Sequence, residues 1–271
     1  MSRRLVSDLA AAYAAWRIPA ASVAAIRAAL GAGWEVVEVR TPAVSAGDGG
    51  VGRAEAAAAA RGAEIYLGFG VSEGVLEAGR GTLRWVHSGT AGVGSSLPSL
   101  RGTGVVLTNS AGVHAEPMAD WVIAAISYFA RGLDRAVEAQ AQRRWVKEEV
   151  ERLAVPMREL QDLRVGILGL GGIGTAVAGR ALGLGMSVAG VRRRPERNGP
   201  AGLRWVGGLD ELPRLAAESD CLVIAAPHTL ATAGAVNRRV LELLPAHAVV
   251  VNVSRGSLLD EAALLALIDA G

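Results

Sequence analysis

Short apolar runs alternate with segments of helical periodicity along most of the chain. An apolar run of roughly four to eight residues between turn signals predicts a buried strand, and a longer periodic run predicts a helix. Strands are predicted at 34–39, 64–67, 83–87, 105–109, 164–168, 187–191, 221–225 and 248–252. Helices are predicted between them at 20–30, 54–61, 173–182, 209–218 and 238–244. This alternation is typical of βαβ units, so we expect an α/β fold with parallel sheets.

The chain has 271 residues, which is long enough for two domains of medium size. We place the boundary near Leu100, because a second set of strands begins at Val105. The prediction is two parallel-sheet domains, at residues 1–100 and 101–271.

One predicted helix, from Ala115 to Arg131, differs from the others in its apolar pattern. Its large apolar residues, such as Trp121, Ile126 and Phe129, occupy more than one stripe of the helix surface. A helix of this kind is expected to be buried on several sides. It either joins the two domains or contacts a partner subunit, and we predict a homodimer formed through it.

Composition excludes several classes of function. The single cysteine, Cys221, leaves no internal disulfide and no cysteine-based metal cluster, and we predict no metal site. The net charge is +2 and no long basic stretch occurs, so nucleic acid is not an expected partner. No apolar stretch suits a signal peptide or a membrane span. The sequence therefore predicts a cytoplasmic protein without a membrane partner.

The most informative motif is the sequence GLGGIG at residues 169–174, between a predicted strand and a predicted helix. In a dinucleotide-binding turn each glycine has a separate task. Gly169 would make the tight turn, Gly171 would let the backbone approach a pyrophosphate, and Gly174 would let helix and strand pack closely. The helix N-terminus, at Gly172 and Ile173, would offer N–H groups to the phosphates. The alternative is an ordinary glycine-rich turn.

The end of the next predicted strand indicates which dinucleotide binds. An NAD-binding sheet has an acidic residue there, which bonds the ribose 2′-hydroxyl. This chain instead has Arg192, Arg193 and Arg194, and arginines form forked hydrogen bonds to a phosphate. We therefore predict NADP(H) as the preferred cofactor, with NAD(H) as the alternative. A solvated basic turn with no ligand is the competing interpretation.

Four segments together resemble the D-isomer-specific 2-hydroxyacid dehydrogenases. They are residues 169–174, 252–261, 89–94 and 107–116, and the resemblance runs from about residue 64 to residue 271. The arginine-rich strand end is similar to that of the NADPH-dependent glyoxylate/hydroxypyruvate reductases in this family. The resemblance implies a flavodoxin-like substrate domain at 1–100 and a Rossmann domain at 101–271.

The resemblance also implies the role of three residues. Arg255 matches the family's catalytic arginine, which binds the 2-keto acid and polarises its carbonyl. Hydride transfer builds negative charge on that oxygen, and a fixed guanidinium group stabilises it. Ala91 and Gly92 would offer backbone N–H groups to the substrate carboxylate. A structural arginine and a glycine-rich turn without a catalytic role are the alternatives. The residues predicted to bind the cofactor are Gly169, Gly171, Gly172, Ile173, Gly174, Arg192, Arg193, Arg194, Pro227 and Val253.

The sequence departs from the family pattern in two ways. Gly94 stands where the family usually has an acidic residue. The family's catalytic glutamate and histidine, its last sheet strands and its final helix would lie beyond residue 271. We therefore expect an incomplete Rossmann domain, poor cofactor binding, and slow turnover or none. None of the four histidines, at positions 87, 114, 228 and 247, clearly replaces the proton donor, although His228 would lie near the nicotinamide.

Three functions are compatible with these motifs. The first is NADPH-dependent reduction of a small 2-keto acid, such as glyoxylate or hydroxypyruvate, to the D-2-hydroxy acid. The second is a non-catalytic NADP(H)-binding sensor or scaffold on the same fold. The third is another dehydrogenase, such as an amino-acid dehydrogenase, which the segment around Arg255 disfavours. The sequence leaves the individual substrate and the oligomeric state open.

Overall fold

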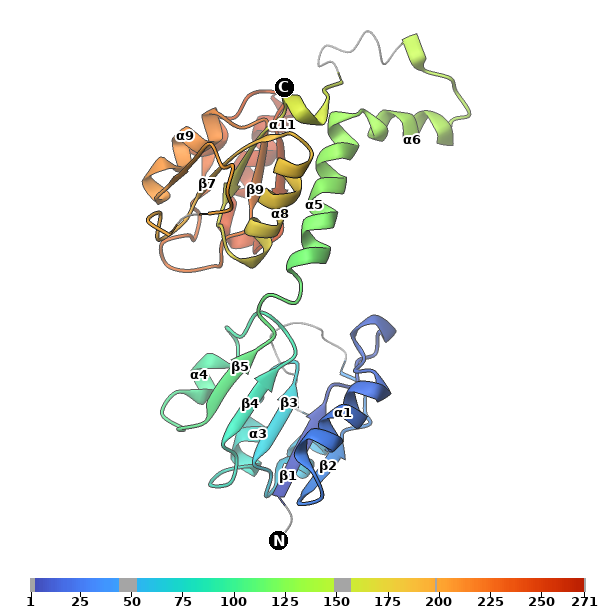
Figure 1. The fold of residues 1–271 in the computed structure, drawn as a ribbon, viewed down its shortest axis with the longest axis vertical. Helices are drawn as coiled ribbons and strands as arrows, with labels where there is room; N and C mark the ends of the chain where they lie inside the picture. The colour runs from blue at the N-terminus through green and yellow to red at the C-terminus, as the bar shows by residue number, and fades with distance from the viewer. Residues whose placement is uncertain (1–2, 44–52, 149–156, 198, 271) are drawn as a thin grey trace. The chain divides into compact units, whose positions relative to one another are not determined.

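A computed structural model describes residues 3–43, 53–148, 157–197 and 199–270. The chain divides into two compact units, Met1–Val113 and His114–Gly271. Each unit contains one five-stranded sheet, and every strand pair is parallel. The prediction of an α/β protein with two parallel-sheet domains is confirmed (Figure 1).

The sheet of the first unit has the strand order β2-β1-β3-β4-β5. Its strands are β1 (Arg3–Asp8), β2 (Trp34–Glu38), β3 (Ile65–Gly68), β4 (Trp85–Ser88) and β5 (Val106–Asn109). Its helices are α1 (Ala20–Leu30), α2 (Ala54–Ala60), α3 (Glu73–Ala78) and α4 (Leu97–Leu100). A short 3-10 helix covers Ala14–Trp16.

Two apolar layers hold this sheet, because successive side chains of a strand point to opposite faces. Val6 of β1 packs with α2, α3 and α4, in a cluster that includes Val75 and Val86. Its neighbour Leu5 packs on the other face with Ile65 and with α1. The helix α1 does not cover that whole face, because Trp85 and Val106 are 38% and 58% exposed.

The boundary between the units differs from the one expected near Leu100. The strand β5 pairs in register with β4, from Trp85 opposite Val106 to Ser88 opposite Asn109, and so belongs to the first sheet. The first unit therefore ends at Val113. Both sheets are parallel, so an apolar run of this length fits the edge of either one, and its sequence does not specify which.

The sheet of the second unit has the strand order β10-β9-β6-β7-β8. Its strands are β6 (Arg164–Leu168), β7 (Ser187–Val191), β8 (Trp205–Gly207), β9 (Cys221–Ile224) and β10 (Val249–Asn252). Its helices are α5 (Ala115–Ala130), α6 (Leu133–Ala141), α8 (Gly172–Gly183), α9 (Leu212–Ala217), α10 (Arg238–Leu241) and α11 (Glu261–Asp269). The 3-10 helices are Leu160–Asp162, Leu209–Glu211 and Gly256–Leu258. The chain order reverses between β6 and β9, which is where a doubly wound sheet binds its ligand.

The helix α5 lies along α8 in the second unit (Figure 1). Ala119, Val122 and Ile126 are fully buried in the cluster that includes α8 and β6. Two large apolar side chains of the helix stay open in this chain, since Trp121 and Phe129 are 58% and 52% exposed. Within the chain the helix is thus buried on one side only. No helix in the described part of the chain is long and apolar enough to cross a membrane.

A buried ionic cluster joins three segments at the amino edge of the second sheet. The carboxylate of Asp220, which is 2% exposed, accepts hydrogen bonds from the backbone and guanidinium group of Arg164. Arg158 Nη1 lies 2.6 Å and His247 Nε2 lies 2.8 Å from its Oδ1 atom. Burial acts to raise the pKa of Asp220, but these hydrogen bonds outweigh it and hold the pKa far below its usual value. The adjacent thiol of Cys221 has its pKa raised to about 12 by burial and by the Asp220 charge.

We expect the substitution Asp220→Asn to lower the free energy of unfolding at pH 7 by about 3 kcal/mol, because it leaves two arginines facing an uncharged group. The folded pKa lies below the unfolded one, so the carboxylate contributes its stability above about pH 4 and loses it as the pH falls further. Urea unfolding at pH 7 and at pH 3 measures this. If the unaltered chain and Asp220→Asn differed in free energy of unfolding by the same amount at both pH values, the lowered pKa of Asp220 would be contradicted.

Candidate functional site

The glycine turn after β6 has the backbone that its motif predicts. Gly169 has a φ of 102°, a left-handed conformation that favours glycine. A Cβ atom on Gly169 would lie 2.5 Å from the backbone nitrogen of Ala226, and one on Gly174 would lie 1.9 Å from the carbonyl oxygen of Gly169. Both positions therefore require glycine for the close packing of β6, α8 and β9.

Gly171 differs from these two glycines, because a Cβ atom there would meet no protein atom within 4 Å. It stands at the N-cap of α8, and no side chain caps the helix. The first N–H groups of a helix have no partner within it, and the helix dipole places partial positive charge there. The open space above Gly171 and the free N–H groups beside it together suit a phosphate group.

A cavity of about 380 Å³ opens beside this turn, at the carboxyl ends of β6, β7 and β9. It contains six of the residues predicted to bind the cofactor, namely Gly169, Gly171, Arg192, Arg193, Arg194 and Pro227. Gly172, Ile173 and Gly174 follow in α8 and do not line it. Val253 is also outside it, since its N–H donates to the carbonyl of Ile224 at 3.0 Å and extends the sheet.

The basic side of the cavity is the turn from Arg192 to Arg197, which a side-chain hydrogen bond closes. Nη1 of Arg192 donates a hydrogen bond of 2.8 Å to the carbonyl oxygen of Arg197, which also lines the cavity. Arg193 and Arg194 are exposed. None of the described residues that line the cavity is acidic. The charge at this end is therefore positive only, which favours an anionic group on the ligand.

The opposite wall of the cavity includes two threonines that the sequence analysis missed. The hydroxyl of Thr232 donates to the carbonyl of Pro227 at 2.6 Å and accepts from the N–H of Thr229 at 2.9 Å. These bonds hold the loop after β9 against the cavity, which Thr229 and Thr232 both line. The dipeptide Pro227-His228 after a buried strand was the only sequence signal for this loop.

Arg255 lies in a separate turn after β10, outside the cavity. The side chain of Asn252 shapes this turn: its amide donates to the carbonyl of Arg255 at 3.0 Å, and its oxygen accepts from the N–H of Ser254 at 2.9 Å. The guanidinium group of Arg255 donates to the carbonyl of Ser254 and pairs with no carboxylate in the described part of the chain. It is exposed and available to an anionic ligand.

Ala91 and Gly92 belong to the first unit, where they lie in the loop after β4. The loop begins at the carboxyl edge of the sheet, and the N–H of Gly89 donates to the carbonyl of Gly68 at 2.7 Å. Ala91 is exposed and Gly92 is half-buried.

The four histidines have different environments. Nδ1 of His87 lies 2.8 Å from the hydroxyl of Thr108, and burial lowers the pKa of His87. His247 belongs to the Asp220 cluster. His114 stands at the N-cap of α5. His228 is exposed and lies between Pro227 and Thr229, which both line the cavity. No group of acidic, histidine or cysteine side chains in the described residues could hold a metal ion.

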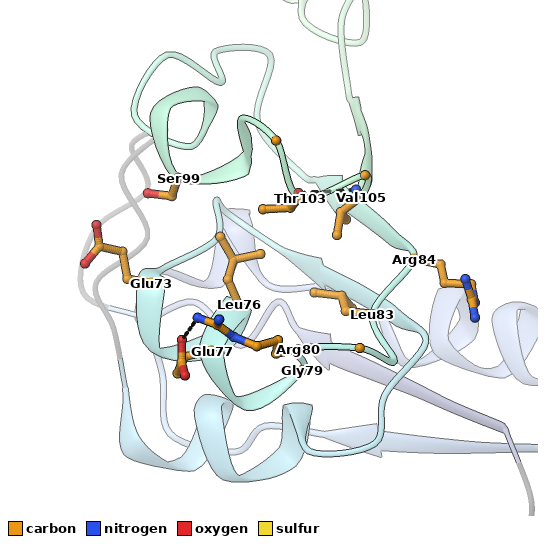
Figure 2. A pocket seen from close by; sticks show the side chains of 13 residues that line it. Glu73, Leu76, Glu77, Gly79, Arg80, Leu83, Arg84, Ser99, Thr103 and Val105 are labelled. Carbon is orange, nitrogen blue, oxygen red and sulfur yellow. Dashed lines mark hydrogen bonds and ion pairs between the residues drawn. The ribbon is translucent and has the colours of Figure 1, made fainter.

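The first unit also has a cavity, which lies away from the loop that contains Ala91 and Gly92. It has a volume of about 740 Å³ and lies near the amino ends of β4 and β5, beside the end of α3 (Figure 2). Arg80 and Glu77, which form an ion pair, both line it (Figure 2). None of the predicted site residues lines it. The loop with Ala91 is at the other edge of the sheet, so this cavity is not part of the candidate site.

Comparison with known families gives a match over more than half of the chain. The sequence pattern of the D-isomer specific 2-hydroxyacid dehydrogenase, NAD binding domain, matches residues 123–271. This segment contains the glycine turn, the arginine-rich cavity and the turn with Arg255.

Individual relatives are more distant. Glyoxylate/hydroxypyruvate reductase A of Yersinia enterocolitica is 30% identical over 185 residues, which is 68% of this chain and 53% of that protein. Glyoxylate reductase of Thermococcus litoralis is 33% identical over 175 residues, covering 62% of this chain and 51% of that protein. The chain thus spans about half the length of the curated relatives it matches.

Solved structures resemble almost the whole chain. A D-isomer specific 2-hydroxyacid dehydrogenase from Xanthobacter autotrophicus Py2, in complex with NADPH and MES, is 28% identical, with a TM-score of 0.72 over 98% of this chain and 77% of that one. A D-isomer specific 2-hydroxyacid dehydrogenase family protein from Aeromonas salmonicida has a TM-score of 0.78 at 23% identity, over 100% of this chain and 79% of that one. The second likeness shows the fold alone.

Proposed function

The chain belongs to the D-isomer specific 2-hydroxyacid dehydrogenase family, and we propose that it transfers hydride between NADP(H) and a small 2-keto acid or its D-2-hydroxy acid. The observation that carries this proposal is the cavity at the switch point of the second sheet, whose ligand-facing end has arginines and no carboxylate. The relatives are named as glyoxylate and hydroxypyruvate reductases, which supports a substrate of that class.

Arginines at the end of β7 support NADP(H) over NAD(H). A carboxylate at this position would accept hydrogen bonds from a ribose but would repel a 2′-phosphate. Arg192, Arg193 and Arg194 line the cavity instead, and Arg197 lies beside them. A guanidinium fork matches phosphate geometry. The solved relative from Xanthobacter autotrophicus was crystallised in complex with NADPH.

The chain's own residues would act by binding and by electrostatics. The N–H groups at the start of α8 would bind the pyrophosphate, and the space above Gly171 would let it approach. The reduced nicotinamide, when bound, supplies the hydride. Arg255 would hold the substrate carboxylate or carbonyl and stabilise the negative charge that develops on oxygen. Ala91 and Gly92 would bind the carboxylate through backbone N–H groups.

A second candidate is a non-catalytic NADP(H)-binding sensor or scaffold on the same fold. The observation that favours it is the state of the histidines. Both ring nitrogens of His87 and the Nε2 atom of His247 have partners within their own units, and His228 is the histidine that adjoins the cavity. A general acid must lie within hydrogen-bond reach of the carbonyl oxygen of the substrate. A chain without such a proton donor would bind NADP(H) but not reduce a 2-keto acid, and this separates the sensor or scaffold from the dehydrogenase.

We further propose that the chain forms a homodimer through α5, because the helix leaves large apolar side chains uncovered. Trp121 and Phe129 are more than half exposed, and Leu133 and Val137 of the adjoining α6 are 46% and 53% exposed. Large apolar side chains gathered on exposed helix surface are typical of protein interfaces.

The test of cofactor preference is the ratio of the NADPH and NADH dissociation constants. We expect the unaltered chain to bind NADPH more tightly, and Arg192→Asp to weaken NADPH binding by roughly 10- to 100-fold, because a charge-assisted hydrogen bond is replaced by repulsion. Arg239→Asp, which makes the same charge change on α10 outside the cavity, should leave the ratio unchanged. Tighter binding of NADH by the unaltered chain would overturn the preference.

The test of the reaction is NADPH oxidation with glyoxylate or hydroxypyruvate. We expect turnover, however slow, that falls roughly 100- to 1000-fold in Arg255→Ala, because the group that stabilises the developing charge is lost. The dissociation constant of NADPH should not change, because Arg255 lies outside the cavity. NADPH binding with no turnover of any 2-keto acid would favour the sensor or scaffold instead.

The test of the dimer is the molar mass in solution, measured by sedimentation equilibrium. We expect the unaltered chain to be dimeric and Trp121→Glu with Phe129→Glu to be monomeric, because a charge on each subunit would be buried in the interface. Leu230→Glu is the control, since Leu230 is fully exposed in a loop of the same unit. A monomeric unaltered chain would refute the proposal.

A further inference from the structure

The loop after β4 has an unusual set of hydrogen bonds: three successive carbonyl oxygens each accept one. The carbonyl of Thr90 accepts from the N–H of Ser110 at 3.2 Å. The carbonyl of Ala91 accepts from the side-chain amide of Asn109 at 2.6 Å. The carbonyl of Gly92 accepts from the hydroxyl of Thr90 at 2.7 Å. Two of these donors are side chains, so the loop conformation depends on particular residues.

The hydroxyl of Thr90 is itself positioned by a hydrogen bond with the hydroxyl of Ser88. Thr90 is 6% exposed, and Ser88 at the end of β4 is fully buried. The two hydroxyl oxygens are 2.9 Å apart, and the N–H of Thr90 donates to that of Ser88 at 3.3 Å. A hydroxyl has one proton to donate. Since Thr90 donates its proton to Gly92, Ser88 must donate to Thr90, and the direction of every bond is fixed.

The amide of Asn109 is placed by the sheet. Asn109 is the last residue of β5 and lies opposite Ser88 in the β4–β5 register. The next residue, Ser110, continues this pairing, since its N–H is shared between the carbonyls of Ser88 and Thr90. The side chain that holds Ala91 therefore projects from a regular strand end.

Fixing a carbonyl also fixes the N–H group that follows it, because a trans peptide is planar and its C=O and N–H point in opposite directions. Asn109 therefore orients the N–H of Gly92, and Thr90 orients the N–H of Val93. Neither N–H has an acceptor among the described residues. Both residues are half-buried, so each keeps part of its surface open to solvent.

We propose that Thr90 and Asn109 are positioning residues, which hold the N–H groups of Gly92 and Val93 ready to bind the carboxylate of the substrate. This inference rests on the proposed function, in which this loop binds that carboxylate, and it extends the binding groups to Val93. Neither positioning side chain needs to touch the substrate. Their effect is to avoid the cost of ordering the loop when the substrate binds.

Charge balance agrees with this assignment. The groups that hold the loop are a carboxamide and hydroxyls, so they add no negative charge beside the bound carboxylate. Gly94 brings no acidic side chain to the loop either. Two N–H groups donating to one carboxylate form charge-assisted hydrogen bonds, which are stronger than neutral ones.

The experiment titrates the complete ¹⁵N-labelled chain with oxalate, a small dicarboxylate, and follows the backbone amide signals of Gly92 and Val93. We expect both signals to shift. Thr90→Val and Asn109→Ala should each weaken the oxalate affinity by about tenfold, as expected for a mispositioned charge-assisted bond. Thr90→Ser keeps the hydroxyl and should bind like the unaltered chain.

The matched control is Thr103→Ala. This substitution also removes a hydroxyl that donates to a backbone carbonyl, that of Leu100, at 2.8 Å. The bond lies in the same unit but at the other edge of the sheet. The NADPH dissociation constant should be the same in all variants, because the cavity is in the second unit. If Thr90→Val does not fold, the oxalate affinity of Asn109→Ala still tests the proposal, because Asn109 is only half-buried.

The inference is overturned if oxalate leaves the amide signals of Gly92 and Val93 in place, or if both variants lose no more affinity than Thr103→Ala. The second result would leave the proposed reduction intact. Conversely, oxalate binding that depends on Thr90 and Asn109 in a chain without turnover would support the inference while refuting the proposed reaction. Where turnover occurs, KM for glyoxylate should rise in both variants with kcat nearly unchanged.

Discussion

Parallel pairing throughout both sheets is the constraint on which the candidate sites depend. Because all strands of a sheet run in one direction, their carboxyl ends lie at one edge, and loops far apart in the sequence meet there. The turn after β6, the arginines after β7 and the threonine loop after β9 line one cavity for this reason. The loop after β4 and Asn109 meet at the corresponding edge of the first sheet.

The sequence predicts the strands whose apolar runs are long and the turn whose glycines are required by close packing. It does not predict β1, because Arg3 and Arg4 begin that strand and only Leu5 and Val6 are large and apolar. It does not predict β8 either, which has three residues. The sequence also does not assign β5 to its sheet, so the observed boundary differs from the one expected near Leu100. A short apolar run fits the edge of either parallel sheet, and packing rather than the local pattern decides which sheet it joins.

The residues of the candidate site likewise fall into those that the sequence predicts and those that it does not. Gly169, Gly171 and the three arginines are predictable because their motif specifies local backbone and charge. Thr229, Thr232 and Arg197 were missed because they reach the cavity only through loops that fold back on themselves. Arg255 was predictable from its neighbours, but the role of Asn252 in shaping its turn depends on hydrogen bonds that a sequence pattern does not contain.

The raised pKa of Cys221 has a practical consequence. Thiolates, rather than thiols, react with alkylating and labelling reagents, and this buried thiol has its pKa raised to about 12. It is also the single cysteine of the chain. A cysteine introduced on the surface of either unit would therefore be the one reactive thiol, without removal of a native residue. Pairs of such probes, one in each unit, would allow the distance between the loop after β4 and Arg255 to be measured by spectroscopy.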